Sequence, residues 1–364
     1  AYQVLNDKKM RADGKDFKPI FGVEAYFIPS LSDWKEEYER IKADKKNKKH
    51  IDVEGAKTII EDESASKKNT KNILNDRSHL ILLAQNQEGL NNIFSLTSKS
   101  FQGDSFYRYP RIDYEMLKAH SEGVIATSAC LGGVYAKDYW KNCAYETNDD
   151  TGKQRKIGEN KEDILRAMRQ TSERMREIFG DRWYAELQWN SVPEQHSLNK
   201  YIIQMHKEFN VPLISTADSH YPTPDSWKDR ELYKRLGWLG KGNMPAWLSE
   251  QLPESVSDIG YELYPKNGDD MWTSYKRYSE EAGVTYDDNL VRESIESTYK
   301  IAHEKIARFE PDNKVRLPDF VVPDNSTATQ ALTKSCANGL KKLGLLDKDY
   351  LDRLREELNV IDDR

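Results

Sequence analysis

A carboxylate and an imidazole stand two residues apart at Asp218 and His220, shortly after an apolar run at 211–214. In α/β folds, residues at the carboxyl ends of strands are the usual ones for chemistry. Side chains two apart in an extended segment point to the same side, so both could reach one metal ion or one substrate atom. The same pair also fits an ordinary strand-end turn, because Pro222 and Pro224 follow it. The pair therefore needs partners elsewhere before it predicts a site.

Three further residues of metal-ligand type lie on or beside expected strands. Glu24 stands in an apolar and aromatic run at 19–28, where it either faces solvent or needs a partner, since an unpaired buried carboxylate is costly. His79 begins the apolar run at 79–84, a position that also suits a hydrogen-bonded core or edge histidine. Cys130 follows the apolar run at 123–128 and precedes two glycines that permit close backbone approach; a buried cysteine can equally be inert packing.

A mixed set of carboxylate, imidazole and thiolate donors is typical of zinc, and manganese is possible where oxygen and nitrogen dominate. The recurrence of these types at strand positions favours a metal site without establishing one. The three cysteines of the chain are widely spaced, which suits a reducing compartment rather than a disulfide framework.

Composition limits the classes of function. The 364 residues are enough for two or three domains, and 32% charged residues suit a charged, solvent-facing surface. A formal charge of -6 gives no global basic signal for nucleic acid, so any contact with DNA would be local. No apolar run approaches the roughly 20 residues of a membrane span, and we expect no signal peptide. Both ends look truncated, because each reads as the middle of a helix.

The segment at about 31–76 differs in character from its surroundings. Five lysines fall within 42–49, but acidic residues are scattered around them and aromatic residues are few. We expect a charged surface insertion, partly helical and partly disordered, in preference to a nucleic-acid patch.

Helices and strands alternate through most of the chain. Asn160 can cap a helix through Ile178, and Pro193 begins a second helix, with short apolar strands at 183–187 and 211–214 following them. This order predicts an α/β domain with right-handed parallel crossovers, as a barrel or an open parallel sheet. Helices are expected at 289–309, 327–343 and 349–363.

Eight segments, taken together and in order, carry a family resemblance: 18–26, 78–84, 110–113, 123–133, 179–187, 215–221, 317–320 and 350–361. They resemble the PHP domain of the bacterial replicative DNA polymerase III alpha subunit. The resemblance continues into the run that precedes the polymerase palm in that family, and departs at 31–76 and near 144–160.

The resemblance implies an incomplete distorted (β/α)7 PHP barrel at 1–285 and, at 286–364, the helical start of the palm region. It also implies zinc or manganese ligands at Glu24, His79, Cys130, Asp218 and His220. A His-x-His strand and further ligands of the family would precede Ala1. The palm carboxylates that hold magnesium would follow Arg364, so the chain as given should not polymerise DNA.

By this resemblance, the function expected is a part in DNA replication, with metal-assisted 3′–5′ exonucleolytic proofreading in the PHP part. The expected partners are primer–template DNA, a sliding clamp and other replisome subunits in the cytoplasm, with no membrane. One alternative is a non-catalytic PHP scaffold that docks a proofreading subunit. Another is a free-standing PHP phosphoesterase, against which the segment at 317–361 argues.

Overall fold

The computed structural model describes residues 18–48, 73–147, 154–239, 260–309, 321–322 and 325–362. The chain forms two compact units, Ala1–Glu310 and Pro311–Arg364. The helical segment expected at the amino end of the chain and the middle of the charged insertion lie outside the described residues.

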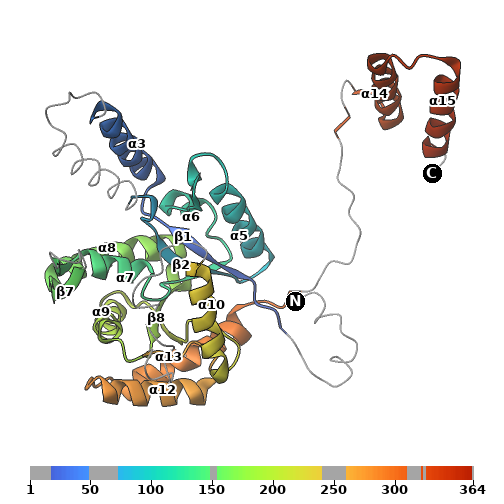
Figure 1. Ribbon diagram of the computed structural model, residues 1–364. Coiled ribbons are helices and arrows are strands. Elements are labelled where there is room, and N and C mark those ends of the chain that lie inside the picture. Colours follow the sequence, from blue (N-terminus) through green and yellow to red (C-terminus); the bar gives the residue numbers. More distant parts are fainter. Residues whose placement is uncertain are drawn as a thin grey trace, which may run out of the picture. The chain divides into compact units, whose positions relative to one another are not determined.

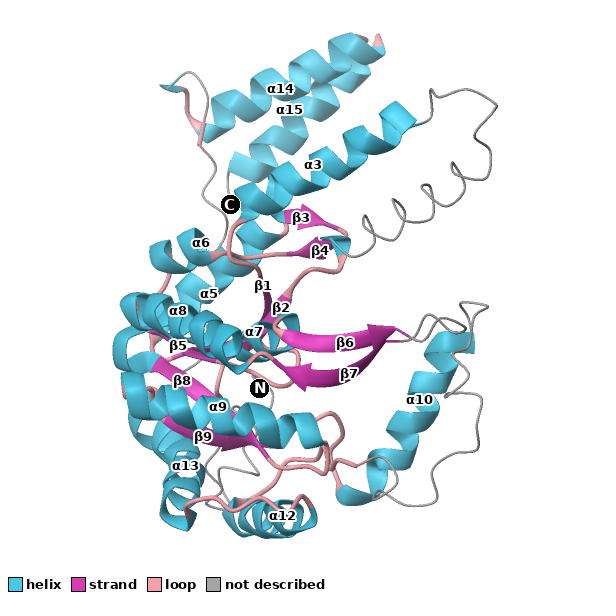
Figure 2. Ribbon diagram, turned by 90° about the vertical axis from the view of Figure 1, so that its left-hand side faces the viewer, coloured by secondary structure: helices cyan, strands magenta, loops and turns pink. Residues whose placement is uncertain are grey.

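The first unit is built on a mixed five-stranded sheet with the order β1-β2-β5-β8-β9 (Figures 1 and 2). Its strands are β1 (Gly22–Phe27), β2 (Ser78–Ala84), β5 (Val124–Thr127), β8 (Trp183–Gln188) and β9 (Leu213–Thr216). Strand β2 pairs antiparallel with both β1 and β5, whereas β5, β8 and β9 are parallel. The prediction of an α/β domain is confirmed, but an open, wholly parallel sheet is wrong among the described strands.

Helices cover this sheet and connect its strands. The described α-helices of the first unit are α3 (Leu31–Lys48), α5 (Gln87–Ser100), α6 (Tyr114–Ala119), α7 (Val134–Lys141), α8 (Lys161–Phe179), α9 (Pro193–Phe209), α10 (Trp227–Leu239), α12 (Gly268–Glu281) and α13 (Asp288–Lys300). Figure 2 shows α8 and α9 beside the parallel strands, and α13 packs against β9.

The helix starts and stops follow from local chemistry. The Asn160 side chain accepts a hydrogen bond from the backbone N–H of Asp163, and α8 ends at Gly180 with φ of 60°, as the sequence predicts. Helix α9 begins at Pro193 and ends at Asn210, which is left-handed with φ of 52°. The helical part expected within 31–76 is α3, whose Trp34 and Tyr38 pack with Ile28 in a small separate core.

The predicted helix at 289–309 is shorter than expected. It runs as α13 to Lys300, widens into a π-helical turn at Ile301–Lys305 and then leaves the helical path. The Lys18 ammonium donates to the carbonyls of Ala302 (2.6 Å) and Ile306 (2.5 Å), which satisfies acceptors that the ended helix leaves open. The Ala307 N–H then donates to the carbonyl of Gln85, so long-range contacts overrode the helical periodicity.

Three smaller features complete the described structure. Two short antiparallel pairs join β3 (Phe106–Tyr107) to β4 (Tyr109–Pro110) and β6 (Cys143–Thr147) to β7 (Gln154–Glu159). The second unit contains α14 (Ala328–Leu343) and α15 (Lys348–Asp362), close to the two helices expected there. None of the described helices combines the length and the apolar character that crossing a bilayer requires.

Candidate metal centre

Glu24 and His79 are neighbours on one face of the sheet. In the antiparallel register Glu24 lies opposite Ile81, so His79 is its diagonal neighbour, and such pairs are within reach of long side chains. The Glu24 Oε1 atom is 2.5 Å from His79 Nδ1, with the two side chains 50% and 32% exposed. Glu24 is therefore neither buried in the core nor unpaired.

The third residue, Cys130, comes from the turn after β5. Its Sγ atom is 3.8 Å from His79 Nδ1 and accepts a hydrogen bond from the Gly132 N–H at 3.4 Å. A Cβ atom on Gly133 would lie 1.9 Å from the Ser128 carbonyl oxygen, so only glycine permits this tight turn. Burial, together with the carboxylates of Asp218 and Glu24, raises the pKa of the Cys130 thiol to about 12.

Asp218 and His220 follow β9 and border the same cavity. Asp218 has φ of 48°, the left-handed region that non-glycine residues rarely adopt. The His220 Nδ1–H donates to the Asp218 carbonyl oxygen at 2.6 Å, which leaves Nε2 as the ring atom able to accept or to ligate. The His220 N–H also donates to the Leu263 carbonyl, so the turn is tied to a segment 43 positions further along the chain.

Glu186, near the end of β8, joins the ends of three parallel strands. It is 5% exposed and accepts from the hydroxyl of Thr127 on β5, the hydroxyl of Thr216 on β9 (2.6 Å) and the N–H of Ala129 (3.2 Å). Burial raises the pKa of this carboxyl. Glu186 is not among the residues predicted from the sequence, although it carries the same signal as Glu24, a lone charged residue in an apolar strand.

All five residues predicted as ligands line one cavity of about 320 Å³ at this edge of the sheet. Seven further residues complete its lining, and they come from the turn after β5, from the end of β8 and the turn that follows it, from α10 and from the segment after residue 259. They are Leu131, Gln188, Asn190, Val192, Arg230, Tyr261 and Leu263.

The donor types in this cavity suit zinc or manganese, since carboxylate, imidazole and thiol groups are all present. The positions of these side chains, however, do not form a complete metal-binding site. Within the parts of the chain that the structure describes, no group of three or more His, Cys, Asp or Glu side chains is arranged so that it could hold a metal ion. The assignment of the five residues as ligands therefore stays a prediction.

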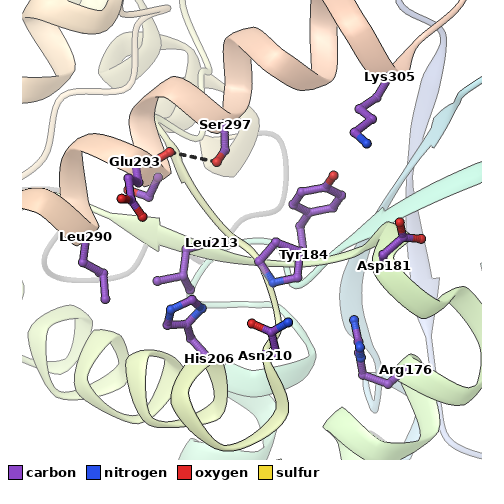
Figure 3. Close-up of a pocket in the computed structure, with 12 residues that line it drawn as sticks. Arg176, Asp181, Tyr184, His206, Asn210, Leu213, Leu290, Glu293, Ser297 and Lys305 are labelled. Atoms are coloured by element: carbon purple, nitrogen blue, oxygen red, sulfur yellow. Dashed lines mark hydrogen bonds between the residues drawn. The ribbon is translucent and has the colours of Figure 1, made fainter.

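A second hollow, of about 420 Å³, borders the opposite ends of β8 and β9 (Figure 3). Arg176, Asp181, His206, Glu293 and Lys305 line it, around the ring of Tyr184. None of the five predicted ligands lies there, so the larger hollow is not the one that the sequence pattern indicates.

Comparison with known proteins agrees with the resemblance seen in the sequence. A family model described as "PHP domain" matches residues 2–190. The DNA polymerase III subunit alpha of Aquifex aeolicus is 28% identical over 361 residues, which is 97% of this chain and 25% of that protein. The same subunit of Helicobacter pylori strain 26695 is 29% identical over 338 residues, covering 85% of this chain and 24% of that protein.

A shorter match is closer in sequence. The DNA polymerase III subunit alpha of Helicobacter pylori strain J99 is 35% identical over 186 residues, 49% of this chain and 14% of that protein. The chain spans about a quarter of the length of the first curated relatives that it matches. It belongs to the PHP domain family and is homologous to part of the DNA polymerase III alpha subunit.

Proposed function

We propose that this chain is the PHP-containing part of a replicative DNA polymerase alpha subunit, and that its PHP domain is a metal-dependent phosphodiesterase that trims a mismatched primer from its 3′ end. The observation that supports the proposal is the common cavity of Glu24, His79, Cys130, Asp218 and His220. The named activity of relatives four times as long supports the replicative role. The proposed partners are primer–template DNA, a sliding clamp and other replisome subunits. The proposed location is the cytoplasm.

The proposed ligands would supply three types of donor: carboxylate, imidazole and thiolate. His220 presents Nε2 because Nδ1 is held by the Asp218 carbonyl, and Glu24 and Asp218 supply carboxylate oxygens. Cys130 must lose its proton to ligate, as thiol ligands do when a metal binds. A bound zinc or manganese ion would lower the pKa of a coordinated water and polarise a phosphoryl oxygen. Magnesium for nucleotidyl transfer is expected only in the longer polymerase.

The test is primer trimming by the purified chain supplied with Mn²⁺ or Zn²⁺. We expect shortening of a labelled primer with a mismatched 3′ end, and loss of at least about 100-fold in rate for Asp218→Ala combined with His220→Ala. The control pairs Asp181→Ala with His206→Ala, the same residue types in the second hollow, and should keep the wild-type rate. Equal rates in wild type and the first double variant would contradict the proposal.

One observation favours a second candidate, a non-catalytic PHP scaffold that docks a separate proofreading subunit. The 2.5 Å contact between Glu24 and His79 satisfies both side chains without a metal, as a purely structural pair would be satisfied. This candidate predicts that the chain trims no primer, and that any metal it binds has a purely structural role. A metal-loaded but inactive wild type would therefore favour it over the catalytic proposal.

A further inference from the structure

The cavity that holds the predicted ligands also contains a cationic side chain with no role so far. Arg230 lies in the first turn of α10, and among the described residues that line the cavity it is the only arginine or lysine. The cavity already holds the carboxylates of Glu24 and Asp218 and lies close to buried Glu186, so a guanidinium strongly changes what it can accept.

Arg230 is held in a defined orientation. Its Nη1 donates to Glu231 Oε1 at 3.1 Å, and Glu231 is only 6% exposed. Its guanidinium carbon lies 5.8 Å from the centre of the Tyr261 ring. The segment that carries Tyr261 is anchored on both sides, through Gly260 O to Ser191 N and through Leu263 O to His220 N.

Neutralising Glu231 does not account for Arg230. Lys234 Nζ already donates to both carboxylate oxygens of Glu231, each at 2.9 Å. A guanidinium has five N–H donors in one plane, and the bond to Glu231 uses one of them. The remaining donors suit an oxyanion with two oxygens in the same plane, which arginine binds bidentately.

We infer that Arg230 binds the phosphoryl oxygens of the substrate, and that the cavity takes an anionic phosphate ester held between this guanidinium and the predicted ligands. Arg230 then acts as a positioning and specificity residue. Its positive charge attracts the second negative charge of a phosphate ester, which the carboxylates of the cavity would otherwise repel. The inference rests on the proposed function for its choice of a phosphate ester over other oxyanions.

The test measures binding of inorganic phosphate by equilibrium dialysis at constant ionic strength, in chelator-treated protein and in protein supplied with Mn²⁺. Arg230→Ala should weaken binding by about tenfold or more in both conditions, as expected for a lost charged hydrogen bond. Arg230→Lys should lie between, because lysine keeps the charge and loses the planar fork. Arg176→Ala, a half-buried arginine of the second hollow, should bind as wild type does.

Thermal unfolding and metal content should be unchanged in Arg230→Lys, which separates a binding role from a structural one should Arg230→Ala fold poorly. Wild-type phosphate affinity in both Arg230 variants, no phosphate binding by wild type, or loss of binding in Arg176→Ala would each overturn the inference. Binding that depends on Arg230 in a chain that takes up no metal would keep this inference and remove the proposed metal chemistry. Metal uptake together with phosphate binding that does not depend on Arg230 would overturn this inference and leave the proposed metal chemistry standing.

Discussion

The two ends of the parallel strands β8 and β9 both border a hollow, and they are assembled differently. At the amino ends, Arg176, His206 and Ser297 bond to backbone carbonyls no more than five residues away. Figure 3 marks one of these bonds, from Ser297 to Glu293. At the carboxyl ends, Glu24 bonds to His79 and Glu186 to Thr216, across 55 and 30 positions of sequence. The three side chains named at the larger hollow thus bond locally, whereas Glu24 and Glu186 at the smaller one bond across strands. Ser294 is an exception at the larger hollow, because its hydroxyl lies 2.7 Å from that of Ser215, 79 positions away.

Backbone geometry separates the two ends as well. Asn210 at the amino end is left-handed, and asparagine tolerates that region. At the carboxyl ends the left-handed residues are Asp218, which tolerates that region much as asparagine does, and Ala129, which adopts it at a cost. Strain combined with long-range polar bonds is characteristic of functional sites, and size alone is not.

The largest effect on stability should come from Glu186. In Glu186→Ala the hydroxyls of Thr127 and Thr216 and the N–H of Ala129 lose their buried acceptor, so the free energy of unfolding should fall by about 3 kcal/mol. The measurement is urea unfolding at neutral pH.

The matched control for this change is Glu293→Ala, an exposed glutamate in the second hollow, which should shift stability by no more than about 0.5 kcal/mol. Equal effects of the two alanine variants would erase the distinction between the two ends.

A half-buried carboxylate outside both hollows, Asp138, is a comparison for Glu186, because it accepts one side-chain hydrogen bond where Glu186 accepts bonds from three groups. Asp138 on α7 accepts a hydrogen bond from the Thr171 hydroxyl at 2.6 Å, and burial raises the pKa of Asp138 to about 6. Because the folded-state pKa lies above the unfolded value, the fold prefers the protonated carboxyl. Its stabilising contribution is present below about pH 4 and is lost as pH rises through about 6.

Asp138→Asn should therefore gain stability over wild type as the pH rises, by about 2 kcal/mol between pH 4 and pH 7.5. Urea unfolding at both pH values measures the gain, and Asp181→Asn at an exposed position should show almost none. A gain that appears at low pH instead would mean that Asp138 is ionised and well paired in the fold.

The smallest effect concerns the left-handed turn at Ala129. Ala126→Gly, within β5, should lower the free energy of unfolding by about 1 kcal/mol or more, because a buried methyl group is lost and the unfolded chain gains freedom. Ala129→Gly loses the same methyl group but relieves a positive φ of 58°, so its cost should be smaller by about 1 kcal/mol. Equal costs in thermal or urea unfolding would show that the turn carries no strain.

Much of the first unit could be predicted from short-range signals. Apolar runs located the strands, the cap at Asn160 and the glycine at Gly180 bounded α8, and residue type with strand position picked out five residues that now share a cavity. Each of these features depends only on the local sequence of the segment that carries it.

The remainder depends on contacts between distant segments. The reversed direction of β2, the π-helical turn that follows α13, and the approach of Arg230 and Tyr261 to the strand ends have no local signature. Whether Glu24 faces the core or solvent could not be predicted locally either. The answer depends on the register of β1 with β2, which places Glu24 beside His79.

Metal content of the purified chain tests the central claim most directly. Elemental analysis after dialysis should find zinc or manganese in wild type and in the control with Asp181→Ala and His206→Ala, and loss of that metal in the variant with Asp218→Ala and His220→Ala. Metal in all three proteins alike, or in none of them, would contradict the account that the carboxyl ends of these strands form a metal site.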